Sequence, residues 1–156
     1  MAAETTVKLS LPSRIRLVDL AHEASQRMAE FAGFEEDAAL DVGLAVREAV
    51  INAITHGNGQ DPARTVDVTL TAGTAELVAT VRDHGSGFEP DPAHDPTSGD
   101  NRLRPNGRGL LLMRAYVDEV KFRNRKGRGF EVILVKQLRP AAEGAGAPEA
   151  PRRTGR

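Results

Sequence analysis

The residues best suited to chemistry lie in the run 47–57, where Glu48, Asn52 and His56 recur at intervals of four. This spacing places the three side chains on one face of an α-helix. A carboxylate can orient or deprotonate a nucleophile, and an amide oxygen is a hard ligand that suits Mg²⁺. A polar stripe is also typical of an ordinary solvated helix face, so this segment alone leaves both interpretations open.

A second candidate is the loop that begins at Asp83, at the end of an apolar run, and continues through Gly85 and Gly87. An aspartate can accept a hydrogen bond from an exocyclic amine such as that of adenine. Glycine has no Cβ, so a flat base can approach the backbone there. A tight turn would have the same Gly-x-Gly pattern, and the loop gains meaning only from its neighbours.

The third candidate is the segment 106–110, in which Gly107 and Gly109 open a predicted helix. The exposed N–H groups of a helix start form a site for anions such as phosphates, and Arg108 adds a charge-assisted donor. Neither a Walker A lysine pattern nor Gly-x-Gly-x-x-Gly occurs in the sequence, which disfavours the P-loop and Rossmann routes.

The composition sets limits on the kind of protein. A chain of 156 residues with 40% hydrophobic and 28% charged residues suits one globular domain. The net charge of −1 gives no broad attraction to nucleic acid, and the basic cluster within 121–128 is interpreted as a solvated hairpin edge. The sequence has no cysteine, no apolar run long enough for a membrane span and no signal-peptide pattern at its start. A cytoplasmic protein without direct nucleic-acid or membrane binding is expected.

The first half of the chain predicts the elements that carry the Glu/Asn pair. Alternating apolar residues predict a strand over 5–11, followed by a helix over about 14–31 with Ser13 as its N-cap. Gly33 is expected to end this helix. Acidic residues at 35–37 begin a second helix, for which Gly57 is the expected C-cap.

The second half predicts two hairpins separated by a loop and a short helix: strands 66–71 and 76–81, a loop over 83–108, a helix over 109–118, and strands 120–124 and 130–138. Because helices and strands do not alternate, an α+β fold is favoured, with a mostly antiparallel sheet and about three helices on one face. The folded domain is expected over 1–138. The tail 139–156, rich in Ala, Gly, Pro, Glu and Arg, is expected to be disordered.

The order of these parts resembles the nucleotide-binding domain shared by gyrase B subunits, sensor histidine kinases and MutL, called the Bergerat or GHKL fold. The most similar members are the small bacterial anti-sigma factor serine/threonine kinases. The run 48–57 resembles their N-box, 83–87 their first glycine box and 107–110 their second. The resemblance covers about residues 7–138, and the ordered set is far more specific than any single box.

This resemblance implies a two-layer α/β sandwich that binds ATP and Mg²⁺ between the helices and the loop. It implies that Glu48 is the general base towards a serine or threonine hydroxyl and that Asn52 coordinates Mg²⁺. The other implied nucleotide-binding positions are Asp83 for the adenine amino group, Gly85 and Gly87 around the base, and Gly107, Arg108, Gly109 and Leu110 at the phosphates. The implied partners are a sigma factor and a STAS-type anti-anti-sigma protein, with a homodimer as a further possibility.

One position departs from the family pattern. Many relatives carry a threonine after the glycine of the last strand, where it contacts the adenine region, whereas Gly129 is followed here by Phe130 and Glu131. This departure motivates an alternative function, a non-catalytic module that uses ATP to shape a sigma-binding surface. A histidine kinase catalytic domain is disfavoured, because a dimerising helix pair with a phospho-acceptor histidine would have to precede the ATP domain.

Overall fold

The computed structural model describes residues 3–85, 107–125 and 127–139. The predicted loop 83–108 and tail 139–156 lie mostly outside these ranges, so both stay predictions. No helix among the described residues is long and apolar enough to cross a membrane. The elements are β1 Thr5–Pro12, a 3₁₀ turn Ile15–Leu17, α1 Val18–Ala32, α2 Glu36–Asn52, a π-helical turn η2 Ala53–Gly57, β2 Thr65–Ala72, β3 Glu76–Arg82, α3 Gly107–Tyr116, β4 Glu119–Arg125 and β5 Gly129–Gln137.

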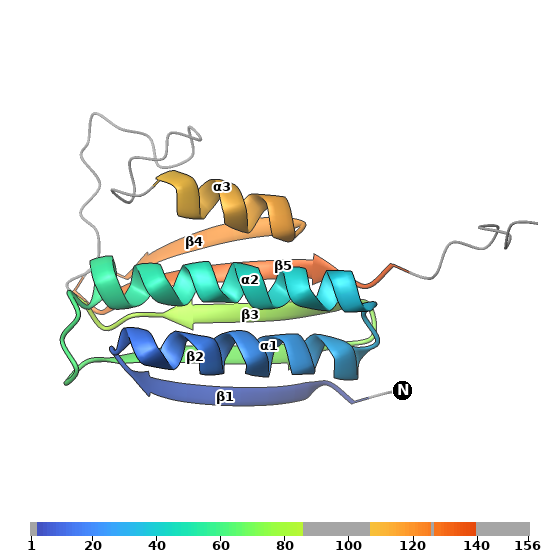
Figure 1. Ribbon diagram of the computed structural model, residues 1–156, viewed down its shortest axis with the longest axis horizontal. Helices are drawn as coiled ribbons and strands as arrows, with labels where there is room; N and C mark the ends of the chain where they lie inside the picture. The colour runs from blue at the N-terminus through green and yellow to red at the C-terminus, as the bar shows by residue number, and fades with distance from the viewer. Residues whose placement is uncertain (1–2, 86–106, 126, 140–156) are drawn as a thin grey trace, which may run out of the picture.

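The described strands form one antiparallel five-stranded sheet in the order β1-β2-β3-β5-β4. Helices α1, α2 and α3 form a second layer on one face of this sheet (Figure 1). The expected α+β architecture is therefore confirmed, and each predicted strand matches an observed strand within about two residues. The match follows from period-two burial, which is regular along β2 and β3.

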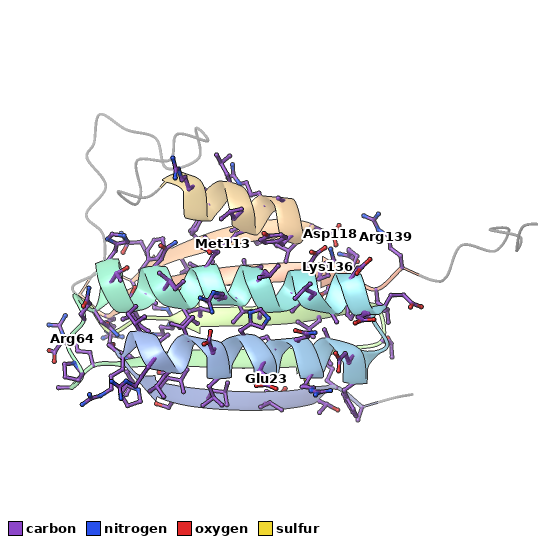
Figure 2. All side chains as sticks on the ribbon, viewed as in Figure 1. Glu23, Arg64, Met113, Asp118, Lys136 and Arg139 are labelled. Atoms are coloured by element: carbon purple, nitrogen blue, oxygen red, sulfur yellow. The ribbon has the colours of Figure 1, made fainter. Side chains whose placement is uncertain are left out.

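The two ends of the sheet are fastened by different contacts. Arg64 lies at the end where the chain leaves η2 for β2, while Asp118, Lys136 and Arg139 gather at the opposite end (Figure 2). There, the Asp118 carboxylate accepts hydrogen bonds from the Gln137 N–H at 2.7 Å and from Arg139 at 3.0 Å. These bonds tie the end of β5 to the start of β4.

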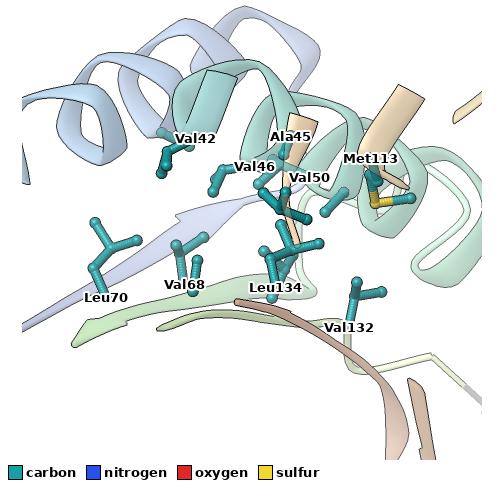
Figure 3. Close-up of a cluster of buried hydrophobic side chains, with 14 of the residues drawn as sticks. Val42, Ala45, Val46, Val50, Val68, Leu70, Met113, Val132 and Leu134 are labelled. Atoms are coloured by element: carbon teal, nitrogen blue, oxygen red, sulfur yellow. The ribbon is translucent and has the colours of Figure 1, made fainter. Parts of the chain in front are cut away.

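The core lies between α2 and the middle of the sheet. Val42, Val46 and Val50 recur every fourth residue along one face of α2 and are fully or almost fully buried. They face apolar side chains of β2 and β5, among them Leu70 and Leu134 (Figure 3). This packing fixes α2, and with it the Glu/Asn pair, on the sheet.

The expected cost of disturbing this core is measurable. Leu70 is fully buried, so Leu70→Ala should lower the free energy of unfolding by about 3 kcal/mol through lost burial and an unfilled cavity. Leu20→Ala is the matched control, because Leu20 is 53% exposed; it should cost less than about 0.5 kcal/mol. Urea unfolding of both variants measures the difference, and equal costs would contradict this description of the core.

Two predicted helix caps are wrong, and both residues have other roles. Ser13 caps no helix: its Oγ donates to the Arg64 carbonyl at 2.6 Å, which joins the end of β1 to the start of β2. Gly57 does not adopt the left-handed conformation of a C-cap; α2 continues as the π turn and ends at Asn58 with φ −93°. By contrast, Gly33 ends α1 at φ 103°, as predicted.

The basic cluster of 121–128 falls on β4, an edge strand, and on the turn after it. Lys121 pairs with Glu119 at 3.2 Å, and Glu131 of β5 forms ion pairs with Arg123 at 3.5 Å and Arg125 at 3.7 Å. These cations are therefore paired within the hairpin, as expected for an edge strand that avoids further pairing.

Candidate functional site

The site is built around the C-terminal part of α2. Glu48 is half-buried and Asn52 is 5% exposed, one helical turn apart on the same face. The chain then widens into the π turn η2, a local irregularity that is frequent at functional sites. His56 lies in this turn and is exposed, so the regular stripe expected from the sequence holds only for Glu48 and Asn52.

Asp83 follows β3 directly and is 1% exposed. Its Oδ1 accepts hydrogen bonds from the N–H groups of Gly85 and Phe130, each at 3.1 Å. Two backbone donors thus fix the plane of the carboxylate and compensate for its burial. The residue that is predicted to recognise adenine is thus held in place by backbone groups of the protein.

Three glycines surround Asp83 and leave no room for side chains. A Cβ on Gly57 would overlap the Asp83 carboxylate, one on Gly85 would overlap the Gly57 carbonyl, and one on Gly129 would overlap the Asp83 carbonyl. Gly129 also has a φ of 98°, which favours glycine. The end of η2, the loop after β3 and the start of β5 therefore converge on one carboxylate.

The helix α3 begins at Gly107, two residues before its predicted start, so both glycines of the second glycine box lie in its first turn. Arg108 is exposed, whereas Gly109 and Leu110 are buried. A Cβ on Gly109 would come within 2.9 Å of Asn52 Nδ2, so the missing side chain lets the first turn of α3 close on α2. This contact brings the Glu/Asn helix and the second glycine box together.

The parts predicted separately thus meet on one helix, because α2 with η2 contacts α3 through Asn52 and the Asp83 loop through Gly57. Gly87 lies outside the described residues. The donors suit Mg-ATP: an amide oxygen and a carboxylate are hard ligands for Mg²⁺, and the close approach of Gly109 puts a helix start, whose N–H groups suit phosphates, beside Asn52.

Sequence reasoning missed the residues that hold the Asp83 loop in place. Gly57 and Gly129 were recognised as turn or cap residues, not as neighbours of Asp83, and Asn58 was not singled out. The one local sign of these contacts in the sequence was Gly57 itself, which ends the run that resembles the N-box. Their contacts with the loop join positions far apart in the chain, so no spacing rule reveals them.

The departure at 130–131 takes a definite form. The Phe130 side chain is buried and stacks on Phe122 with ring centroids 5.7 Å apart, while its N–H binds Asp83. Glu131 lies opposite Arg82 in the register of β3 and β5, and its carboxylate forms ion pairs with two arginines of β4. The backbone of Phe130, not its side chain, is what contacts the Asp83 carboxylate.

The profile of the histidine kinase-like ATPase domain matches residues 11–136. The chain belongs to this family. It is 33% identical over 104 residues to a protein named anti-sigma F factor from Anoxybacillus flavithermus, covering 65% of this chain and 71% of the relative. It is 26% identical over 138 residues to the protein named serine-protein kinase RsbW from Bacillus subtilis, covering 85% of each chain.

A solved structure supports the fold independently. The crystal structure of the RsbU and RsbW domains of a Mycobacterium tuberculosis protein matches with a TM-score of 0.63 and 21% identity. The match covers 88% of this chain and 33% of that longer chain, and at this identity it shows the fold alone. The resemblance to the anti-sigma factor kinases and the histidine-kinase-like fold are thereby confirmed, and the family supports ATP as the nucleotide.

Proposed function

We propose that this protein is an ATP-binding anti-sigma factor that phosphorylates a serine or threonine of an anti-anti-sigma partner. The observation that carries the proposal is the half-buried Glu48, which lies one turn before the buried Asn52. Gly109 of α3 approaches this asparagine closely. A carboxylate in this position supplies a general base beside the nucleotide site. Phosphotransfer to a hydroxyl uses a base as well as a bound nucleotide. The relatives named anti-sigma F factor and serine-protein kinase support the same assignment.

In this proposal Asn52 would hold Mg²⁺ through its amide oxygen, and Asp83 would accept a hydrogen bond from the adenine amino group. In the same proposal, Gly85 and Gly87 would lie against the adenine ring. The phosphates are held at the start of α3 by Gly107, Arg108, Gly109 and Leu110. Bound ATP would supply its γ-phosphoryl group to the oxygen of the incoming hydroxyl, with ADP as the leaving group. Glu48 accepts the proton of the incoming hydroxyl at a carboxylate oxygen, which is general base catalysis.

The proposed partners follow from this activity. They are a sigma factor, which the protein sequesters, and a STAS-type anti-anti-sigma protein, which is the phospho-acceptor. A cytoplasmic location belongs to the same proposal, because sigma factors act on RNA polymerase there. A homodimer stays a prediction that light scattering of the purified protein tests.

The deciding experiment incubates the purified protein with Mg-ATP and candidate anti-anti-sigma proteins and detects phosphoserine or phosphothreonine by mass spectrometry. We expect phosphorylation of one partner that stops when EDTA removes Mg²⁺. Affinity purification from the native host identifies the sigma factor and the partner to use. ATP-dependent capture of a sigma factor without any phosphorylation would contradict the kinase and favour the non-catalytic module.

A further inference from the structure

Asn58 follows the π turn directly and is 2% exposed. Its side-chain amide makes three hydrogen bonds to three separate segments. The Nδ2 group donates to Ser13 Oγ at 2.8 Å and to the Thr65 carbonyl at 2.9 Å. The Oδ1 atom accepts from the His84 N–H at 2.8 Å.

The orientation of this amide is fixed by chemistry. The His84 N–H can only donate and the Thr65 carbonyl can only accept, so the oxygen and nitrogen of Asn58 cannot be exchanged. Ser13 is held in turn, because its Oγ donates to the Arg64 carbonyl at 2.6 Å. The amide therefore connects the loop after β3 to a rigid junction between the end of β1 and the start of β2.

The loop that Asn58 holds is the one that carries Asp83. His84 lies between Asp83 and Gly85. The bond of Asp83 Oδ1 to Gly85 fixes the carboxylate within this loop, and the bond to Phe130 fixes it to the start of β5. The bond from His84 to Asn58 fixes the next residue of the loop to the junction of β1 and β2, on the side away from β5. The His84 imidazole adds a second anchor, with Nε2 2.6 Å from Asp67 Oδ2, but this contact is partly exposed.

We infer that Asn58 is a positioning residue that sets the location of the Asp83 carboxylate and thereby the preference of the site for adenine. It does not touch the nucleotide itself. The inference rests on the proposed function, in which Asp83 accepts the adenine amino group. An amide that served stability alone would leave base selectivity unaffected when removed, because a general loss of stability weakens the binding of all bases alike.

The test compares ATP with ITP, whose base has an oxygen in place of the exocyclic amine. Binding of both nucleotides by wild type and Asn58→Ala is measured by calorimetry, with the Tm of each protein. Asn58→Ala leaves the His84 N–H without its buried acceptor, so we expect the Kd for ATP to rise about tenfold and the Kd for ITP to change little. The preference for ATP should fall by the same factor.

Val42→Ala is the control for stability, because Val42 is a buried core residue of α2 that the site does not use. It should lower the Tm and leave the ATP preference unchanged. A folded Asn58→Ala protein that keeps the wild-type preference overturns the inference and leaves the proposed kinase intact. A wild-type protein that does not prefer ATP over ITP removes the role of Asp83, and with it this inference.

Ser13→Ala decides the matter if Asn58→Ala does not fold. This variant removes one acceptor of the Asn58 amide and leaves the bond to His84 possible. We expect a smaller loss of ATP preference, about threefold, because the amide is less firmly oriented. An unchanged preference in folded Ser13→Ala would then overturn the inference.

Discussion

Glu48→Gln is expected to lower the rate of phosphotransfer by about 10²–10⁴-fold, the usual contribution of a general base, while ATP still binds. Glutamine keeps the size and shape of the side chain but cannot accept a proton at pH 7. Glu48 is half-buried on a helix fixed by Val46 and Val50, so the substitution should leave the fold unchanged. Single-turnover assays with the phospho-acceptor partner measure the rate, and calorimetry measures the Kd for ATP.

Glu36→Gln is the matched control for this prediction. Glu36 lies in the first turn of the same helix, exposed and far from the glycine boxes, so the same chemical change there should leave the rate of transfer unaffected. If Glu48→Gln transfers phosphate at the wild-type rate, Glu48 is not the base. If it loses transfer but still captures the sigma factor in the presence of ATP, sequestration and catalysis are separate functions of one nucleotide site.

The sequence predicted the elements well because their signals are local. Alternation along β2 and β3 comes directly from burial on one face, and the acidic residues at 35–37 mark the start of α2. Gly33 was predicted correctly because a left-handed helix end is decided by the residue itself. The same reasoning failed for Gly57. Its place in the sequence is typical of a helix cap, but in the structure it is the point where the Asp83 carboxylate packs against the backbone.

The residues that hold the site together could not be predicted in this way. Ser13 and Asn58 are 45 positions apart, and Phe130 lies 47 positions from Asp83. A serine before a helix is usually a cap, and only the fold shows that the β1–β2 junction uses this one instead. Family resemblance supplied the proposed roles of Glu48, Asn52 and Asp83, but it did not show which residues position them.

Gly57→Ala is expected to abolish detectable ATP binding, a loss of at least about 100-fold. The added Cβ would overlap the Asp83 carboxylate and lie 2.7 Å from Asp83 Cβ. The Asp83 carboxylate is held by the N–H groups of Gly85 and Phe130, and the π turn is closed by backbone hydrogen bonds. A side-chain rotation therefore cannot relieve the clash, which must displace the π turn or the Asp83 loop. We therefore expect a lower Tm together with the loss of affinity.

Gly73→Ala separates this steric effect from the general cost of replacing a glycine. Gly73 lies in the β2–β3 turn, where the nearest atom to an added Cβ is the Glu76 carbonyl oxygen at 3.5 Å, an ordinary contact. That variant should bind ATP like the wild type. Asp83→Ala tests the cause, because it removes the carboxylate that Gly57→Ala would strike. The double variant should be less destabilised than the sum of the single variants, whereas additive losses would show that the two residues do not meet.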